Sequence, residues 1–291
     1  MLPRKKFQLR LPSRTLVLGE RTLLMGVLNV TPDSFSGDGL NLDTEAAVSR
    51  ALQMQRDGAD ILDIGGESTR PGAEWISAAD ELRRVLPVLQ KLRGQLKIPI
   101  SIDTNKSEVA EAAAEAGAEI INDVTALRRD PRIAEVARRR KLPLILMHMR
   151  GEPLTMQAAP FARNAMMEVT KGLKRAAALA VRAGVPKSQI VLDPGLGFGK
   201  SFEQNYDLIA RLGELARLGF PLLIGPSRKG FIGRTLGGIP EGGRVFGTAA
   251  AVTACILQGA HIVRVHDVSE MAQVARVADA VRSGEAHRRR R

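Results

Sequence analysis

The sequence contains few of the residues on which several common kinds of site depend. Its single cysteine, Cys255, rules out an intrachain disulfide and fits a reducing compartment. No cluster of Cys and His is present that would bind a transition metal. The aromatic residues are eight Phe, one Tyr and one Trp, too few to predict a stacking platform for nucleic-acid bases. These absences exclude a disulfide scaffold, a zinc module and an aromatic nucleic-acid surface.

Long apolar stretches are also missing. No run approaches the roughly 18 residues of a membrane span, and the amino terminus, MLPRKKFQLRLPS, lacks the continuous apolar core of a secretory signal. Cys255 lies in an apolar helical stretch and is interpreted as a small buried hydrophobic residue. We therefore predict a cytoplasmic protein that does not associate with a membrane.

The net charge of +12 is concentrated at the two ends of the chain. Residues 1–10 contain four basic side chains and no acid, and residues 288–291 are four arginines. The charge left in between is that of an ordinary enzyme surface for anionic substrates. We predict that both basic ends are disordered tails and that nucleic acid is not a partner.

Eight short apolar runs, rich in Ile, Leu and Val, alternate with helix-length segments. The runs predict strands at 23–29, 60–65, 98–103, 119–123, 142–148, 190–194, 221–226 and 261–266. The intervening segments predict helices near 43–57, 77–94, 107–116, 131–140, 164–183, 203–217, 243–258 and 269–282. Such strands, apolar on both faces, are typical of a parallel sheet covered by helices.

Nearly every one of these strands ends in polar residues. They are Asn29, Asp63–Arg70, Asp103, Asn122, His148, Asp193, Ser227–Lys229 and Arg264–His266. A doubly wound sheet would concentrate such residues at one switch point, whereas a closed barrel can place them at the ends of many strands. The pattern predicts a single (β/α)₈ barrel at 21–283 with its active site at the carboxyl ends of the strands. Residues 1–20 are a basic segment that caps the barrel, and residues 284–291 form the basic tail.

Helix boundaries are marked by capping residues. Asp43 and Ser77 stand where two helices should begin. Gly58, Gly117, Gly184 and Gly219 stand where others should end, because glycine adopts the left-handed conformation that follows a last helical turn.

Three strand ends should place acceptors around one ligand. Asp103, Asn122 and Asp193 end strands three, four and six of the predicted barrel. A buried carboxylate must be paired, and it can accept two parallel N–H bonds from the edge of an amino-pyrimidinone ring. The pattern favours a flat, donor-rich heterocycle. The alternative is that these acids pair with Lys or Arg and only stabilise the barrel.

The segment DPGLGFGKS, residues 193–201, superficially resembles a phosphate-binding P-loop. Pro194 stands where that motif requires its first glycine, so the match fails. We interpret the glycines as room for a ligand to approach the backbone, with Phe198 available to pack against it.

Hydroxyl and cationic groups follow the predicted strands at 60–65, 221–226 and 261–266. Thr69 and Arg70 follow paired glycines and suggest a clamp for an anion. Arg264 and His266 should lie on one face by strand alternation, where they suit a phosphate. The alternative for His266 is a structural role at the end of the barrel.

Two other histidines are less informative. For His148 a substrate wall and a structural hydrogen bond are equally open, and His261, at the opposite end of the barrel, is interpreted as structural.

Taken together, the motifs resemble those of the dihydropteroate synthase family. The segments NVTPDSFS, DIGGESTRPGA, the aspartate after PISI, IINDV, LDPGLGFGK, SRK and RVHDV occur in the family's order from about Met25 to Asp267. The resemblance implies condensation of p-aminobenzoate with 6-hydroxymethyl-7,8-dihydropterin diphosphate, giving 7,8-dihydropteroate and diphosphate.

The resemblance also implies site residues. Pterin binding falls to Asp103, Asn122, Met147, Asp193, Phe198 and Lys229. Diphosphate binding falls to Asn29, Thr69, Arg70, Arg264 and His266, with Mg²⁺ at Asn29 and Asp33. The p-aminobenzoate site falls to Phe35, Thr69, Pro71, Phe198, Ser227, Lys229 and Gly230. The catalytic residues implied are Arg70, Lys229, Arg264 and His266, in a sulfonamide-sensitive homodimer built on outer helices.

Two positions differ from the family pattern. Residues 36–39 read Ser-Gly-Asp-Gly where the family more often has Ser-Asp-Gly-Gly, and Gly230 stands where many members have serine. The alternatives are a pterin-binding paralogue without synthase activity and a methyltransferase from methylated folate to a corrinoid protein. The methyltransferase would share the acids but has no use for cations around a leaving diphosphate.

Overall fold

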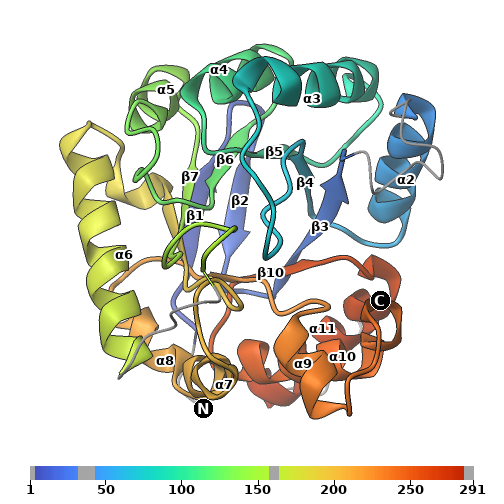
Figure 1. Ribbon diagram of the computed structural model, residues 1–291, viewed down its shortest axis with the longest axis vertical. Coiled ribbons are helices and arrows are strands. Elements are labelled where there is room, and N and C mark those ends of the chain that lie inside the picture. The colour runs from blue at the N-terminus through green and yellow to red at the C-terminus, as the bar shows by residue number, and fades with distance from the viewer. Residues whose placement is uncertain (1–3, 32–42, 157–163, 285–291) are drawn as a thin grey trace.

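The computed structural model describes residues 4–31, 43–156 and 164–284, which form a barrel of parallel strands inside a ring of helices (Figure 1). The strands are β3 (Leu23–Asn29), β4 (Ile61–Gly65), β5 (Ile100–Asp103), β6 (Ile120–Asp123), β7 (Leu144–Met147), β8 (Ile190–Asp193), β9 (Leu223–Ile224) and β10 (Ile262–Val265). Each pairs in parallel with its neighbour in the order β8-β7-β6-β5-β4-β3-β10-β9. A parallel bridge between Leu192 and Leu222 links the two edges. The prediction of a single (β/α)₈ barrel is confirmed.

The helices follow the strands as predicted, with some differences of detail. They are α2 (Thr44–Arg56), α3 (Ala78–Leu92), α4 (Ser107–Glu115), α5 (Ile133–Arg140), α6 (Ala165–Arg182), α7 (Phe202–Ala210), α8 (Leu212–Ala216), α9 (Gly230–Thr235), α10 (Val245–Leu257) and α11 (Val268–Ser283). The predicted helix at 203–217 is two helices, because the chain breaks at Arg211. The short α9, directly after the Ser-Arg-Lys turn, was not predicted.

The predicted capping residues act as expected. The Asp43 and Ser77 side chains accept hydrogen bonds from the backbone N–H groups of Ala46 and Asp80, at 2.9 and 3.1 Å. Gly58, Gly117, Gly184 and Gly219 all have positive φ, so the left-handed conformation that a glycine favours ends the preceding helices.

Strand alternation divides the barrel interior into two zones. Near the amino ends of the strands, inward-facing apolar side chains form one cluster: Met25, Ile61, Ile120, Ile145, Val191, Leu223 and Ile262. Residues two positions later on a strand face the same way. These are Asp63, Asn122, Met147, Asp193 and Arg264. The interior therefore changes from hydrocarbon to polar or charged groups within two residues along β4, β6, β8 and β10, while Met147 keeps β7 apolar.

A hairpin closes the apolar end of the barrel. The strands β1 (Phe7–Arg10) and β2 (Thr15–Leu18) pair antiparallel, and Leu9, Leu11 and Leu18 join the inner apolar cluster. The prediction that residues 1–10 form a disordered tail is wrong for residues 7–10. In β1 the polar Gln8 and Arg10 alternate with Phe7 and Leu9, so Leu9 is buried while Gln8 and Arg10 are exposed.

The burial of the single cysteine matches the sequence analysis. Cys255 is buried in α10, where burial raises the pKa of its thiol. Among the described residues, no helix combines the length and the apolar character needed to cross a bilayer.

Candidate active site

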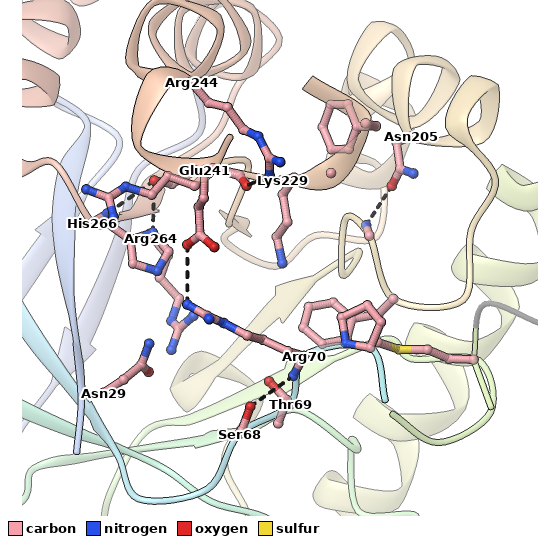
Figure 2. A pocket seen from close by; sticks show the side chains of 18 of the residues that line it. Asn29, Ser68, Thr69, Arg70, Asn205, Lys229, Glu241, Arg244, Arg264 and His266 are labelled. Atoms are coloured by element: carbon pink, nitrogen blue, oxygen red, sulfur yellow. Dashed lines mark hydrogen bonds and ion pairs between the residues drawn. The ribbon is translucent and has the colours of Figure 1, made fainter. Parts of the chain in front are cut away.

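A cavity of about 520 Å³ opens at the carboxyl ends of the strands (Figure 2). Most of the predicted site residues line it: Asn29, Thr69, Arg70, Pro71, Asp103, Phe198, Ser227, Lys229, Gly230, Arg264 and His266. Figure 2 shows that Asn29, Arg70, Lys229 and Arg264 reach this space from different strands and loops. Asp33 and Phe35 lie outside the described residues, as does the stretch 36–39 that differs from the family pattern.

Three predicted pterin ligands lie beneath the cavity and do not line it. Asn122 and Asp193 are buried, with 3 % and 4 % of their surfaces exposed. Met147 packs with Val124 and Met149 under the ring of Phe198. These side chains form the layer directly below the cavity floor.

Arg264 links two carboxylates at the floor of the cavity. Its Nε donates to Asp63 Oδ2 at 2.6 Å and its Nη2 donates to Asp103 Oδ2 at 2.8 Å. Asn122 Nδ2 donates to the same Asp63 oxygen at 3.0 Å. Burial opposes the charge of Arg264, but the two carboxylates outweigh it, so the pKa of the guanidinium is raised. Asp103 is therefore paired with a cation, and Asp63, which the sequence analysis placed at a strand end without a role, is the second partner of that cation.

The pKa values of two acids at the site are raised toward neutral pH. Burial raises the pKa of Asp103 to about 8 against the pull of Arg264, and burial raises the pKa of Asp193 to about 6. Asp193 Oδ1 accepts the N–H of Gly195 at 2.7 Å, which leaves Oδ2 for a further donor. A ligand that brings N–H donors would favour the ionised form of both acids.

A strained turn presents Ser227 and Lys229. β9 ends at Ile224, two residues before the end of the predicted strand 221–226, and Ser227 and Lys229 lie in the turn that follows. Arg228 between them has φ +57°, a costly conformation for a residue other than glycine. Its guanidinium pairs with Asp267, and its N–H donates to Thr248 Oγ1 at 3.1 Å. These contacts hold the turn, and its Ser227, Arg228 and Lys229 all line the cavity.

Lys229 and His266 also line the cavity, and of the two only Lys229 adds a cation. Lys229 Nζ lies 4.2 Å from the centre of the Phe198 ring, and burial together with Arg264 lowers the pKa of the lysine to about 8. His266 Nδ1 lies 3.0 Å from Ser227 Oγ. Burial and the nearby cations, Arg264 first, lower the pKa of His266 to about 3, so it is a neutral imidazole at pH 7.

The glycine-rich loop after β8 is not a phosphate loop, as predicted. Gly195, Gly197 and Gly199 have positive φ, and a Cβ at Gly195 would collide with the His148 carbonyl. Lys200 Nζ donates to the carbonyl oxygens of His148 and Phe198, at 3.1 and 2.9 Å. The lysine thus ties two loops together and holds the Phe198 ring at the cavity.

The loop between β4 and α3, residues 66–77, supplies the opposite wall. Thr69, Arg70 and Pro71 line the cavity. Arg70 Nη2 lies 3.3 Å from Glu241 Oε1, in an exposed pair that joins this loop to the segment before α10 (Figure 2). Glu67 and Glu241 also line the cavity, and the sequence analysis assigned a role to neither. The only available signal was their position beside Arg70 and before Arg244 in otherwise polar segments.

Two further histidines lie away from the main cavity. His148 lines a separate cavity of about 380 Å³ against α6 and is not among the residues that line the main one. His261 Nδ1 accepts the N–H of Leu222 at 3.1 Å, and its Nε2 lies 3.0 Å from the carbonyl oxygen of Lys5. His261 therefore joins the hairpin to the barrel, which confirms the structural interpretation.

The described residues contain no group of three or more His, Cys, Asp or Glu arranged to hold a metal ion. Asn29, half-buried at the end of β3, offers an amide oxygen at the cavity. Mg²⁺ often takes one or two protein oxygens and completes its shell with waters and substrate phosphates. The donors present fit a magnesium ion of that kind.

These features define a barrel enzyme with an acid-lined floor and a cationic wall, and comparisons with known proteins agree. Residues 25–266 match the family model described as "Pterin binding enzyme". The dihydropteroate synthase of Synechocystis is 50% identical over 263 residues, covering 90% of this chain and 91% of that protein. The chain therefore belongs to the dihydropteroate synthase family.

Solved structures extend the likeness to the fold. Dihydropteroate synthase from Yersinia pestis, solved with a sulfonamide drug complex, is 41% identical with a TM-score of 0.89, covering 96% of this chain and 100% of that one. The enzyme from Xanthomonas albilineans, in complex with 7,8-dihydropteroate, is 40% identical with a TM-score of 0.85, covering 95% of this chain and 99% of that one.

Proposed function

We propose that this chain is a dihydropteroate synthase, which joins p-aminobenzoate to 6-hydroxymethyl-7,8-dihydropterin diphosphate and releases diphosphate. The observation that carries the proposal is a single cavity with two features: Asp103 at its floor above the buried Asp193, and Arg70, Lys229 and Arg264 in its lining. A pterin ring needs the first feature and a diphosphate needs the second. A methyl transfer to a corrinoid protein would leave the cationic wall without a substrate group.

The pterin edge is assigned to the buried layer. Asp193 Oδ2 and the Asn122 side-chain oxygen are the acceptors not used by the bonds to Gly195 and Asp63. Met147 and Phe198 supply apolar surface for the ring, and Lys229 lies over Phe198 as a donor. Asp103 contributes through Arg264, to which it is bonded.

The diphosphate is assigned to Asn29, Thr69, Arg70, Arg264 and His266, which all line the cavity. Arg264 offers Nη1, because Nε and Nη2 are held by Asp63 and Asp103. Neutral His266 donates an N–H without adding positive charge. Arg70 is paired with Glu241 through a mostly exposed contact, so an incoming diphosphate can compete for it.

The reaction breaks the bond between the exocyclic carbon and the diphosphate oxygen, and the oxygen keeps the electron pair. Arg70, Lys229 and Arg264 stabilise the negative charge that develops on the leaving group. The carbon becomes cation-like, and the acids below it favour that charge. The arylamine nitrogen then forms the new bond and loses a proton to solvent, so no covalent enzyme nucleophile is needed.

The p-aminobenzoate is assigned to the upper cavity. Thr69, Pro71 and Phe198 border this space, and Lys229 reaches it from the turn before α9. The carboxylate is assigned to Ser227 and Gly230, and Phe35 is assigned to the same subsite. Since sulfonamides mimic p-aminobenzoate, we also infer that they inhibit this chain.

A magnesium ion is proposed at Asn29 with Asp33. When bound, Mg²⁺ neutralises part of the diphosphate charge and so favours its departure. Asn29 would orient the ion at the end of β3.

We further infer a homodimer formed through outer helices. Phe246 of α10 and Val277 and Val281 of α11 are 85%, 66% and 60% exposed, and these two helices pack side by side. Light scattering tests this inference, and a Phe246→Ser variant that is monomeric beside a dimeric parent would support it. A monomeric parent would contradict it.

Product formation tests the synthase assignment. Incubation with the dihydropterin diphosphate, Mg²⁺ and labelled p-aminobenzoate should move the label into 7,8-dihydropteroate. Pterin binding without product would instead support a paralogue that lacks synthase activity.

A further inference from the structure

A buried group of three charged side chains lies beside the active site and has no part in the assignments above. Lys106, between β5 and α4, places Nζ 2.9 Å from Glu67 Oε1 and 2.6 Å from Glu81 Oε2. The side chains of Lys106, Glu67 and Glu81 are 13%, 3% and 0% exposed. We call these three residues the buried triad.

Stability alone is a poor explanation for the buried triad. One cation faces two carboxylates, and burial raises the pKa of Glu81 against the pull of Lys106. The desolvation of such a group often exceeds the attraction within it, and apolar residues of similar volume would be as stable. A buried ionic group of this kind is better explained by the geometry that it fixes.

The buried triad holds both ends of the loop at residues 66–77. Glu67 Oε1 accepts the N–H of Ile76 at 2.7 Å, so its carboxylate spans the base of the loop. Glu67 Oε2 accepts from Asn105 Nδ2 at 2.5 Å, and Lys106 lies next in the chain. The two ends of the loop, at Glu67 and at Ile76, are thereby both attached to Asn105 and Lys106, which follow β5.

The backbone at the start of this loop packs closely against α3, which leaves it little room to move. A Cβ at Gly66 would lie 2.7 Å from Val85 Cγ1 and 3.1 Å from Glu81 Cγ, so the loop presses on α3 at the position of Glu81. Arg84 Nη1 donates to the Gly66 carbonyl oxygen at 2.8 Å. Any shift of Glu81 or Glu67 is therefore transmitted to the loop backbone.

The outer part of the loop has weaker attachments. Gly72 donates its N–H to Pro153 at 3.0 Å, and Arg70 contacts Glu241 through a pair in which Arg70 is 63% exposed. Thr69, Arg70 and Pro71 thus reach the cavity from a segment whose firm support lies at its base.

We propose that Lys106 is a positioning residue, which clamps Glu67 to Glu81 and so fixes the loop that presents Thr69 and Arg70 to the diphosphate and the p-aminobenzoate. The proposal rests on the synthase function for its kinetic consequence, but its structural consequence stands apart from that function. Among the described residues, Lys106 is not part of the cavity lining, and its ion pairs are with Glu67 and Glu81 and not with the pterin ligand Asp193.

The test compares Lys106→Met with Lys106→Arg and with a matched control, Arg4→Met. Arg4 forms a buried ion pair with Asp279 at 2.8 Å near the amino end of the barrel, away from the loop. Hydrogen exchange followed by mass spectrometry measures the loop amides, and calorimetry with 6-hydroxymethylpterin, which lacks the diphosphate, measures the pterin site.

For Lys106→Met we expect faster exchange confined to residues 66–77, an unchanged Kd for 6-hydroxymethylpterin, and a kcat about 10- to 100-fold lower with a higher KM for p-aminobenzoate. Lys106→Arg should restore much of the kcat, and Arg4→Met should leave the loop exchange and kcat unchanged. If Lys106→Met does not fold, Glu67→Gln, which keeps an acceptor for Ile76, should show the same pattern at smaller size.

Unchanged loop exchange in folded Lys106→Met, or in Glu67→Gln, would overturn the proposal. So would an equal loss of pterin affinity, because that result would show a general structural role. Failure of the synthase assignment would appear differently, as a wild-type chain without turnover in which the exchange difference persists.

Discussion

The two ends of the barrel interior are built from the same strands and differ in almost every physical property. At the amino end, inward side chains such as Met25 and Ile145 are apolar, fully buried and sealed by Leu9 of the hairpin. At the carboxyl end, two residues further along, Asp63 and Arg264 are paired ions below a cavity. Stability and chemistry are thereby separated along the barrel axis. The apolar end can offset the cost of holding charges at the other.

The largest effect should come from breaking the charge pairing at the carboxyl end. Arg264→Ala leaves Asp63 and Asp103 without their cation. Removal of one partner of a buried ion pair lowers the free energy of unfolding by about 3–5 kcal/mol, and we expect a loss of that size here. Turnover should fall by roughly 100-fold or more, since a donor to the leaving group is lost as well. Denaturant titration and diphosphate release measure the two effects, and a fully active, equally stable variant would refute the pairing role.

The matching change at the amino end should alter stability alone. Leu9→Ala removes a buried side chain from the hairpin and should cost about 2–5 kcal/mol of unfolding free energy. The kcat and both KM values of the folded fraction should be those of the parent. A kinetic defect at a temperature where the variant is folded would contradict the separation of the two ends.

Within the carboxyl end, Asp193 should govern pterin affinity. Asp193→Ala removes an acceptor and leaves the ligand's N–H groups unpaired, at about 1–3 kcal/mol for each group. Calorimetry should show a correspondingly weaker Kd for the pterin. Asp193→Asn, which keeps an oxygen for the Gly195 N–H, separates the loss of the carboxylate from a change in the loop, and parental affinity in both variants would count against the assignment.

Protonation offers a probe of the amino end. Burial lowers the pKa of His261 to about 4 from an ordinary value of 6.5. The folded protein therefore binds fewer protons than the unfolded chain, and stability is lost as the pH falls from 6.5 toward 4. His261→Gln should flatten this dependence by about 1.4 kcal/mol per pH unit. Parallel curves for the variant and its parent, from urea unfolding at several pH values, would exclude the effect.

The smallest effect concerns the difference from the family at Gly230. A Cβ there would meet no atom within 4 Å, so serine fits. Gly230→Ser should provide a hydroxyl for the p-aminobenzoate carboxylate and lower its KM by roughly 2- to 10-fold, for a hydrogen bond of about 0.5–1.5 kcal/mol. An unchanged KM would place the carboxylate elsewhere.

The sequence predicted the barrel and most of the cavity lining because both depend on local pattern. Apolar runs ending in Asp103, Asn122 or Arg264 identify a strand and its carboxyl end without knowledge of the partners. Alternation then predicts that Arg264 and His266 face the same way, and both line the cavity.

The partners themselves could not be predicted from local pattern. Arg264 and Asp63 are 201 residues apart and meet only because the barrel closes with one particular register. The buried triad likewise draws Glu67, Glu81 and Lys106 from three different segments. The hairpin was missed for another reason, since its basic residues concealed the apolar alternation of Phe7 and Leu9.

The most direct test of the central claim is diphosphate release from 6-hydroxymethyl-7,8-dihydropterin diphosphate with Mg²⁺, measured with and without p-aminobenzoate. The structure predicts release that depends on p-aminobenzoate and that a sulfonamide blocks, because the acid floor, the cationic wall and the upper subsite share one cavity. Tight binding of the dihydropterin diphosphate without release would contradict the synthase assignment.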